Sequence, residues 1–597
     1  MIEWLHPGFI YLFGALLIPF LKGKWQKAYL LLLPIVAFVD LMYMSPGVFW
    51  RIPFLEYELV FGRVDKLSLV FAYIFVIASF LMTIYALHVK RSGEHVAAFI
   101  YVGSTLGLVF VGDLFTLIIF CELMAISSML LIGYRGTRAA FEAGLRYIMV
   151  HIFAGACLLG GVIMHVQATG SIAFNTIGLN DFASYFILTG FLINAAVPPL
   201  HAWLADAYPE ATVTGAVFLT AFTTKSSIYV LIRGFPGVEV LIWLGAIMAV
   251  YGVIFAVLEN DIRRLLAYHI ISQVGYMVCG VGIGTTMALN GAAAHAFCHI
   301  LYKALLFMGA GAIIEVTGRS KFTELGGLYK YMPLTFWLYM IGAFSISGFP
   351  LFNGFVSKTM VVEASALSHL PIIWLLLEGA SIGTFLHTGL KVPYLAWFAR
   401  KEPACEAREP PKNMLVAMGL TAFLCTLLGV YPQILYRMLP YQVDYVPYAA
   451  GHVIGMSQLL LFTFVGFWLL RGMLHGTPTI TLDTDWFYRM GMKKFIWFCQ
   501  KPLMTFANAV NNGVMKVVSS IVWFSRNPTA ATNIMVNSVA FMVLRPFNPV
   551  YKQYARNLEE LKRTYPGEPM QRVAVGTGVL LTLVFLSFYL IIYFIYA

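Results

Sequence analysis

The sequence predicts an all-α polytopic membrane protein with about 14–16 transmembrane helices, because apolar runs long enough to span a bilayer recur from end to end. Of its 597 residues, 60% are hydrophobic and only 11% are charged, whereas a soluble globular domain has about 25% charged residues. Helices are predicted because a helix satisfies its own backbone hydrogen bonds in lipid.

Basic residues are concentrated in short loops between the apolar runs, and the formal net charge is +11. Short basic loops are typical of the cytoplasmic side of a membrane. The pattern therefore indicates a multi-pass protein of the cell (inner) membrane and argues against nucleic-acid binding. The basic loops cover residues 22–27, 90–91, 135–146, 263–264 and 319–330.

The first apolar run predicts a retained transmembrane helix. Glu3 stands where a signal peptide has basic residues, and Lys22 and Lys24 follow the run. The seven cysteines are scattered and form no CxxC pair, so neither a disulfide framework nor an iron–sulfur site is expected.

Composition divides the chain into four predicted regions. N-terminal transmembrane helices (1–96) precede a dense helical core (97–475), and an amphipathic lateral region (476–571) precedes a final transmembrane helix (572–597). About 45 helical residues in the lateral region would extend about 70 Å along the membrane surface. We expect prolines to break or kink that helix at Pro528, Pro546 and Pro549.

Two core segments resemble each other. Residues 193–200 and 390–395 each place a polar side chain shortly before Val-Pro within an apolar helix. Such interrupted helices at matching places in two halves favour an internal transporter repeat that carries an ion path. Chance is the alternative, because proline is frequent in membrane helices.

Ionisable side chains inside apolar runs are candidates for ion translocation, because they are costly in a bilayer. Glu122 lies in the middle of a predicted helix, and the alternative for it is a structural hydrogen bond from a protonated acid. Lys225 is a second candidate, unless it extends to the membrane surface. His269 is a secondary candidate, because its closeness to Arg264 also suits an interfacial position.

His295, His299 and Lys303 follow one another at four-residue steps in an otherwise apolar helix. They share one helical face and lie about 6 Å apart along the axis. Histidine titrates near neutrality, so this spacing predicts a proton relay through intervening water. The alternatives are satisfied core histidines and a metal site. Ala296 replaces the glutamate of a zinc-protease helix, and no third ligand is evident, so no metal is expected.

A similar four-residue step joins His387 to Lys391, just before Pro393. Lys358 follows a Gly- and Pro-rich break at 347–354 and is a secondary candidate, with a helix-end anchor as its alternative. No nucleotide-binding loop, dinucleotide fingerprint or Ser-His-Asp context is present. We therefore expect no cofactor and no catalytic chemistry in this chain itself.

Several segments, taken in order, resemble one family: the antiporter-like subunits of Mrp-type Na+/H+ antiporters (their D-type subunit), NADH:quinone oxidoreductase (complex I) and membrane-bound hydrogenases. The residues FCELM resemble the family's F-x-E-[LM]-M, and HAWLADAY is similar to H-x-W-L-P-D-A-Y. DIRRLLAY and HAFCHILYKALLF match two further signatures. These segments cover residues 120–124, 201–208, 261–268 and 295–307.

The resemblance implies two inverted repeats of five helices, each with a broken helix, and two half-channels joined by a central polar axis. Glu122 then matches the family's key glutamate, and Lys225 matches a lysine found in many members. The trio His295, His299 and Lys303 matches the central axis, and Lys391 matches the ionisable residue of the second broken helix.

One position departs from the family pattern. Asn194 stands where members usually carry a lysine in the first broken helix, so an ammonium that could pair with Glu122 is missing. Lys225, Arg146 or His151 could substitute for this ammonium beside Glu122. We hypothesise that the first half-channel is altered in coupling or does not pump.

The resemblance implies a proton-translocating membrane subunit of a multisubunit complex, with Na+/H+ exchange left open. Its partners would be other membrane subunits, contacted in part by the lateral region, whose beginning at 482–489 resembles that of members with a long lateral helix. The alternatives are a pumping subunit of a complex I-like or hydrogenase complex with redox chemistry in partner subunits, a stand-alone solute transporter, and a scaffold with a degenerate half-channel.

Overall fold

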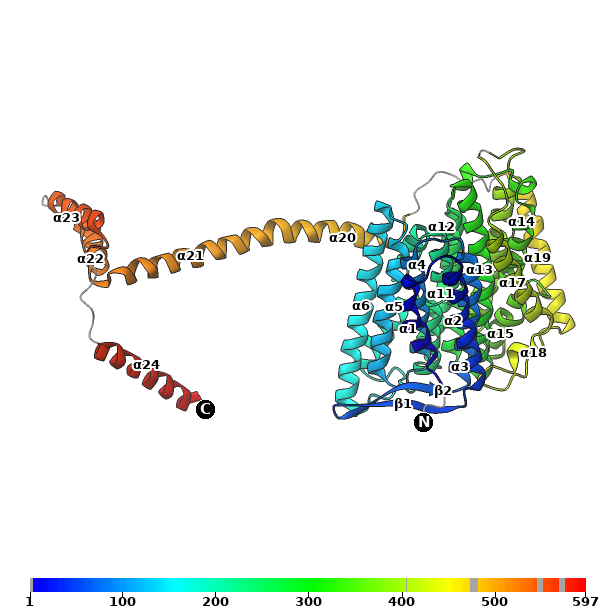
Figure 1. Cartoon of the computed structure of the whole chain (residues 1–597), viewed down its shortest axis with the longest axis horizontal. Helices are drawn as coiled ribbons and strands as arrows, with labels where there is room; N and C mark the ends of the chain where they lie inside the picture. Colours follow the sequence, from blue (N-terminus) through cyan, green and yellow to red (C-terminus); the bar gives the residue numbers. More distant parts are fainter. Residues whose placement is uncertain (1–3, 404, 473–481, 545–550, 568–574, 597) are drawn as a thin grey trace. The chain divides into compact units, whose positions relative to one another are not determined.

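The computed structural model describes the whole chain except residues 1–3, 404, 473–481, 545–550, 568–574 and 597. It divides into two units, Met1–Asp485 and Trp486–Ala597. Twelve described helices are long and apolar enough to cross a membrane, and three shorter apolar helices accompany them. The predicted all-α polytopic class is confirmed (Figure 1).

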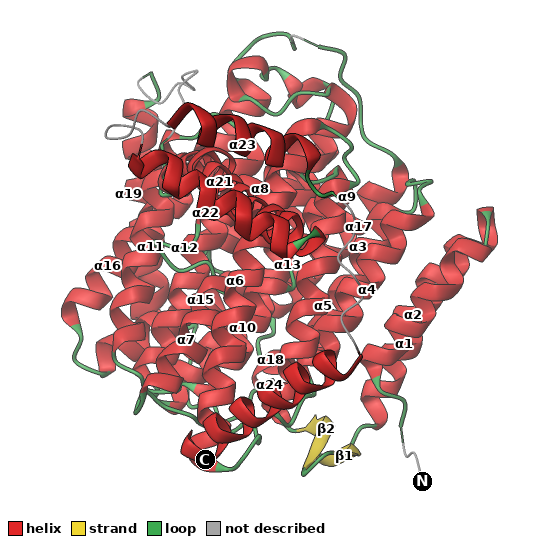
Figure 2. Cartoon of the chain, turned by 90° about the vertical axis from the view of Figure 1, so that its left-hand side faces the viewer, coloured by secondary structure: helices red, strands yellow, loops and turns green. Residues whose placement is uncertain are grey.

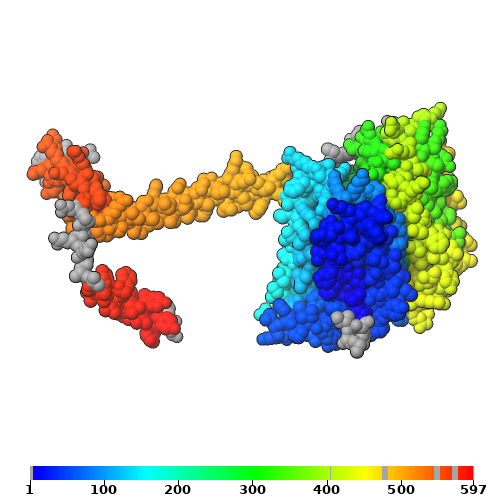
Figure 3. Space-filling view, viewed as in Figure 1, coloured from blue at the N-terminus to red at the C-terminus, as the bar shows by residue number. Residues whose placement is uncertain are grey.

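The first unit begins with helices that lie on its lateral surface, coloured blue in Figure 3. A short antiparallel hairpin follows them and is the one sheet among the described residues (Figure 2). This hairpin was not predicted from the sequence. The elements are α1 (Pro7–Leu17), η1 (Ile18–Phe20), α2 (Gly23–Tyr43), β1 (Gly47–Phe54), β2 (Tyr57–Val64) and α3 (Lys66–Ala86).

Two sets of helices share one layout. In each set a helix is followed by two longer neighbours, and equivalent residues lie 148 positions apart (113 and 261, for example). The first set is α4 (Ser92–Val109), α5 (Leu114–Gly133) and α6 (Arg138–Thr169), and the second is α11 (Val240–Leu258), α12 (Ile262–Ile283) and α13 (Thr286–Thr317).

The local chemistry of the two sets also agrees. Asp113 and Asp261 each cap the following helix by accepting hydrogen bonds from its first backbone amides. Each forms an isolated bridge to the strand-like residue beyond the third helix. Gly170 and Gly318 end α6 and α13 in the left-handed conformation, with φ of 69° and 67°. An internal repeat is therefore present.

The two repeats run in opposite directions. Arg135, just beyond the C-terminal end of α5, and Arg263, at the N-terminal end of α12, both donate to the carbonyl of Pro209. Equivalent helices therefore present opposite ends to one site. This agrees with the expected inversion, but the Val-Pro segments 193–200 and 390–395 do not mark its register, because they lie outside the 148-residue offset.

Each repeat contains interrupted helices. The first continues with α7 (Phe182–Asn194), α8 (Ala202–Ala207), η2 (Tyr208–Glu210), α9 (Val213–Leu219) and α10 (Thr223–Gly234). The second continues with η3 (Phe322–Glu324), η4 (Leu328–Lys330), α14 (Pro333–Ser347) and α15 (Asn353–Leu367). The break between α14 and α15 holds Gly348 and Leu351 at φ of 76° and 77°.

Lys391 was predicted to lie in the second broken helix, and this prediction is wrong. Its helix runs without a gap through α16 (Pro371–Thr384), η5 (Phe385–Lys391) and η6 (Tyr394–Phe398). The stretch around Lys391 is π-helical, and Val392 N–H donates to the His387 carbonyl five residues back. The wider turn accommodates Pro393, which lacks an N–H.

Three helices complete the first unit: α17 (Lys412–Val430), α18 (Gln433–Tyr436) and α19 (Ala450–Leu470). The basic loops meet at one end of the bundle. Gln26 donates to Ser92, Arg91 donates to the Tyr134 carbonyl, and Arg135 and Arg263 share Pro209. We call this the basic end and the opposite end, where β1 and β2 lie, the hairpin end.

The second unit contains the lateral region and the last span. α20 (Asp485–Phe498), η7 (Cys499–Leu503) and α21 (Met504–Arg526) follow one another without a gap. Asn527 ends this helix before Pro528, as predicted. Pro546 and Pro549 lie outside the described residues. The unit continues with α22 (Pro528–Leu544), α23 (Tyr551–Thr564) and α24 (Val575–Tyr596), whose core qualifies as a membrane span.

Candidate ion-translocation site

Nearly all of the residues predicted from sequence are buried inside the first unit. The exposed fraction is 0% for Lys225, His295, His299, Lys303 and His269. Lys358, His387, Lys391 and Asn194 are also buried, and Glu122 is the half-buried exception. Buried side chains of this kind are costly in a membrane, so they need either internal partners or a function.

α13 carries the central trio on one face, as predicted. The ring centroids of His295 and His299 lie 6.1 Å apart, and Tyr302 lies 5.2 Å from His299. Neither ring nitrogen of His299 has a hydrogen-bond partner among the described residues, and neither does Lys303 Nζ. These unsatisfied polar atoms line one face of a buried helix, which is where water molecules would be needed.

His295 belongs to a polar network that extends over four helices. Its Nδ1 lies 3.3 Å from Ser357 Oγ on α15, and its Nε2 lies 3.4 Å from the Tyr302 hydroxyl. Tyr302 donates to Gln273 on α12 at 3.3 Å, and Gln273 donates to Thr384 on α16 at 3.4 Å. This network connects the centre of α13 to the helix that carries His387 and Lys391.

Three buried lysines are held by backbone carbonyls near the C-terminal ends of helices. Lys225 Nζ donates to the Thr220 carbonyl at 2.5 Å, beyond α9. Lys358 Nζ lies 3.3 Å from the Ser347 carbonyl at the end of α14, and Lys391 Nζ lies 2.6 Å from the Val257 carbonyl at the end of α11. Helix C-termini carry partial negative charge, so they stabilise ammonium groups without a paired carboxylate.

Lys303 differs from these lysines because no carbonyl or side chain among the described residues accepts its hydrogen bonds. It lies close enough to Lys225 and His299 for their charges to interact. Neighbouring positive charges repel one another at this depth.

A branch of the network leads from the centre to the basic end. The His269 and His387 ring centroids lie 5.7 Å apart, and His269 lies close enough to Lys303 and Lys391 for electrostatic interaction. Lys391 also donates to the Glu259 carbonyl at 3.2 Å, and the Glu259 carboxylate pairs with Arg264 at 3.2 Å. His269 is therefore central, not interfacial.

A second branch leads to the hairpin end. Lys358 Nζ donates to Ser381 Oγ at 2.7 Å, and Glu378, one turn earlier on α16, interacts with the same ammonium. Glu378 lines an open cavity of about 760 Å³, together with Glu363 and Asp444. Lys358 therefore lies between the buried network and the open cavity. It belongs to α15, which together with α14 forms the broken helix of the second repeat.

The first repeat offers a different set of groups. The Glu122 carboxylate packs against Gly155 of α6, where an added Cβ would overlap Oε1. No hydrogen bond or ion pair joins Glu122 to another of the described residues. Asn194 Oδ1 instead accepts from His151 Nδ1 at 2.7 Å, and Arg146 pairs with Asp206 at 2.7 Å.

A buried carboxylate joins the two repeats at the basic end. Asp483 Oδ2 lies 3.2 Å from His201 Nε2 in the first repeat, and Asp483 accepts from Tyr251 and Tyr268 in the second, both at 2.5 Å. Burial raises the pKa of Asp483, but the hydrogen bond and charge of His201 outweigh it and hold this pKa well below the usual range. Asp483 therefore remains an anion that links both repeats.

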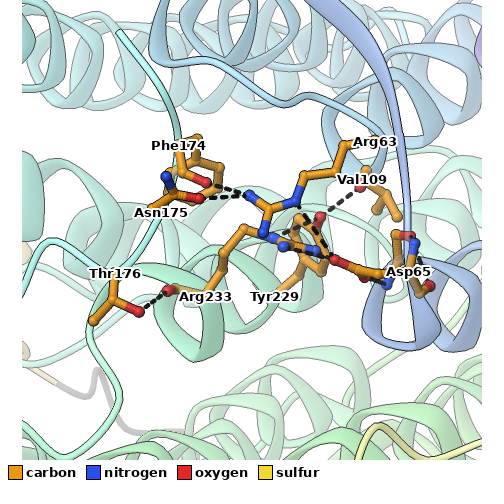
Figure 4. Close-up of polar contacts among 9 residues, drawn as sticks. Arg63, Asp65, Val109, Phe174, Asn175, Thr176, Tyr229 and Arg233 are labelled. Carbon is orange, nitrogen blue, oxygen red and sulfur yellow. Dashed lines mark hydrogen bonds and ion pairs between the residues drawn. The ribbon is translucent and has the colours of Figure 1, made fainter. Parts of the chain in front are cut away.

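Another carboxylate anchors the first repeat at the hairpin end (Figure 4). Asp65 pairs with Arg233 at 2.8 Å and with Arg63 at 3.6 Å. Although burial raises the pKa of Asp65, the hydrogen bond from Arg233 brings it below the usual value. Arg233 also donates to Tyr229 at 3.0 Å, so the end of α10 is fixed to the start of α3.

Several of these residues were not singled out from sequence. Ser357, Tyr302, Gln273 and Ser381 are common polar residues whose importance depends on tertiary contacts. Only Tyr302 had a local signal, because it neighbours Lys303 on the same helix. Among the described residues, no group of three or more His, Cys, Asp or Glu side chains could hold a metal ion.

This fold and site define a class: a polytopic antiporter-like membrane subunit with inverted repeats and a buried line of lysines and histidines. Residues 111–384 match the family model described as "NADH:quinone oxidoreductase/Mrp antiporter, TM". The chain is 32% identical over 344 residues to the D-type subunit of an Na+/H+ antiporter from Alkalihalophilus pseudofirmus, covering 54% of this chain and 69% of that protein. The chain therefore belongs to the NADH:quinone oxidoreductase/Mrp antiporter family.

Two further comparisons agree. An uncharacterised Methanocaldococcus jannaschii protein, MJ1309, is 31% identical over 358 residues, covering 55% of this chain and 73% of that protein. The fold resembles a chain of an archaeal membrane-bound sulfane sulfur reductase, with a TM-score of 0.65, 24% identity, and coverage of 77% of this chain and 98% of the other. The chain is a multi-pass protein of the cell membrane, and the similar antiporter subunit and the solved structure are each part of a multisubunit membrane assembly.

Proposed function

We propose that this chain is a proton-translocating subunit of a multisubunit membrane complex. One observation carries the proposal: in the second repeat, buried ionisable side chains follow one another from a cavity at the hairpin end to Glu259 at the basic end. Histidine and desolvated lysine can each bind and release protons, and water can bridge groups that are not in direct contact.

The order of the groups suggests how a proton would move. Glu378 and Lys358 exchange protons with the cavity. His295 is the next group, because its ring contacts Ser357, the residue that precedes Lys358 on α15. His299 and Lys303 form the centre, and His269, His387 and Lys391 continue to the basic end. By the positive-inside rule, the basic end faces the cytoplasm. No step requires a cofactor in this chain.

Na+/H+ exchange is a second candidate, favoured by the carboxylates of Glu363, Glu378 and Asp444 around the cavity. Acidic lining of a low-dielectric cavity concentrates cations at its mouth. The similarity to a D-type subunit of an Na+/H+ antiporter supports the same candidate. In a complex I-like or hydrogenase assembly, redox chemistry in partner subunits would drive the same path.

The lateral region is proposed to bind neighbouring subunits. α21 buries none of its residues, and its exposed Val510, Val514, Val517 and Ile521 recur at helical spacing on one face. An apolar stripe of this length matches either another subunit or the membrane surface. Deleting α21 should reduce the amount of this chain that copurifies with its partner subunits.

The proposal is tested by replacing Lys303 with alanine in the assembled complex. Proton uptake into sealed vesicles, followed with a pH-sensitive dye, should fall at least tenfold by the order of magnitude usual for a lost proton-transfer group. Lys330→Ala is the matched control, because Lys330 is an exposed lysine in a surface ion pair. Full proton flux in an intact Lys303→Ala complex would contradict the proposal and favour a scaffold.

A further inference from the structure

The first repeat contains a histidine at the position equivalent to the centre of the second. His151 on α6 lies 148 residues before His299 on α13, the offset that relates the two repeats. Gly155 is the equivalent of Lys303 by the same offset. The Glu122 carboxylate packs against Gly155, so it occupies the side of α6 that Lys303 occupies on α13.

The hydrogen bond of His151 fixes its tautomer. Its Nδ1 lies 2.7 Å from Asn194 Oδ1, and an amide oxygen can only accept, so Nδ1 carries the hydrogen. In the neutral ring, Nε2 therefore keeps its lone pair. His151 Nε2 is buried and has no hydrogen-bond partner among the described residues.

Aromatic neighbours hold the ring in place. Tyr147 and Trp203 lie 4.2 Å and 4.6 Å from it, centroid to centroid. Trp203 Nε1 donates to the Ile193 carbonyl at 2.9 Å, which fixes the indole against the end of α7. Tyr147 is fixed by a 2.8 Å hydrogen bond to Ser128. The ring therefore has one free polar atom in a rigid pocket.

Glu122 is an acid on the neighbouring helix α5 that reaches the same helix α6 and forms no ion pair among the described residues. Gly155, which the carboxylate touches, lies four residues after His151 on α6, a rise of about 6 Å. The carboxylate and the ring are thus about one helical turn apart along α6, and water molecules can bridge polar groups that are not in direct contact. Asn194 is neutral, so His151 can become an imidazolium without a fixed ammonium beside it.

We infer that His151 is the proton carrier of the first half-channel, in the place of the lysine absent at Asn194. His151 Nε2 accepts a proton delivered from Glu122, and the imidazolium keeps its Nδ1–H bond to Asn194. Release of the same proton from Nε2 toward Lys225 and the centre restores the neutral ring, so no co-reactant is needed. Asn194 acts as a positioning residue that keeps Nε2 free. The inference rests on the proposed function.

The test compares proton flux of the assembled complex in sealed vesicles. His151→Phe keeps an aromatic ring between Tyr147 and Trp203, and His151→Gln can still bond to Asn194. Both should lower flux at least threefold without loss of the complex. His165→Phe on the same helix is the matched control and should leave flux unchanged. Full flux in both His151 variants would overturn the inference.

Two double variants separate a relay from a structural role. Asn194→Lys should restore at least half of the flux lost in His151→Phe, because a lysine at 194 supplies a proton carrier from the neighbouring helix. Adding Glu122→Gln to His151→Phe should cause no further loss, because both groups act in one path. Absence of rescue together with additive losses would also overturn the inference. If Lys303→Ala keeps full flux, the proposed function fails; if only the His151 variants do, this inference fails alone.

Discussion

The two inverted repeats share a backbone but differ in chemistry. Asp113 and Asp261 cap equivalent helices, and Gly170 and Gly318 end equivalent helices. On α13 the central face presents two histidines and a lysine. On α6 the equivalent face presents Tyr147, His151 and Gly155, and the nearby acid comes from α5 instead.

Helix caps and turns are the same in both repeats, whereas the residues on the buried face differ. Caps are local, since each depends on a few backbone groups near one residue. A proton path depends on a series of groups, so replacing one member changes which neighbour must carry the proton. In the second repeat the series reaches both ends of the bundle, and in the first it is short and includes the neutral Asn194.

The largest difference between the repeats should appear when one ionisable group is removed from each. Lys358→Met should reduce proton flux at least tenfold, because Lys358 joins the network to the cavity at the hairpin end. Glu122→Gln should reduce it about threefold, because the branch through Lys391 remains open. Vesicle flux of both variants, normalised to the amount of complex, checks this ranking.

Lys358→Arg refines the same comparison. Arginine keeps the positive charge at the end of α14 but does not release its proton. Flux should therefore stay as low as in Lys358→Met. Recovery of flux in the arginine variant would indicate that Lys358 only stabilises the helix end, and equal losses at Glu122 and Lys358 would contradict the proposed difference.

Much of the fold could be predicted from sequence, because membrane spans depend on length and hydropathy alone. The trio on α13 was also predictable, since its four-residue steps define one face of any helix. The lateral helix and its end at Pro528 followed from proline chemistry.

What could not be predicted depends on tertiary contacts. The Val-Pro resemblance suggested the wrong repeat register, because Pro393 is absorbed by a π-helical turn instead of a break. Lys391 was a primary candidate and Lys358 a secondary one, because the sequence does not show that the Lys358 ammonium contacts the Ser347 carbonyl at the break between α14 and α15. The link from Asp483 to His201 joins residues 282 positions apart, so no local pattern could reveal it.

Removing that link should loosen the junction between the repeats. Asp483→Ala removes the acceptor of three polar partners, of which His201 and Tyr268 are buried, and should lower stability by about 3 kcal/mol, visible as a lower Tm in detergent. The native pKa of Asp483 is depressed, so its contribution is present above the unfolded value of about 3.9 and is lost only as pH falls through the still lower folded value. Lowering the pH from 7 to 5 should therefore leave the wild-type advantage over Asp483→Ala intact; its disappearance at pH 5 would contradict the assignment.

The smallest expected effect tests whether the repeats are equivalent where they look alike. Gly170→Ala and Gly318→Ala should each cost about 1–2 kcal/mol, because both residues are left-handed and an added Cβ would meet no atom within 4 Å. The cost is then purely conformational and should shift the Tm of the two variants equally. Gly160→Ala is the control: it lies inside α6 with open space around it, so alanine should be neutral or stabilising. Unequal shifts at Gly170 and Gly318 would mean that the surroundings of the two caps, and not the repeat itself, decide how α6 and α13 end.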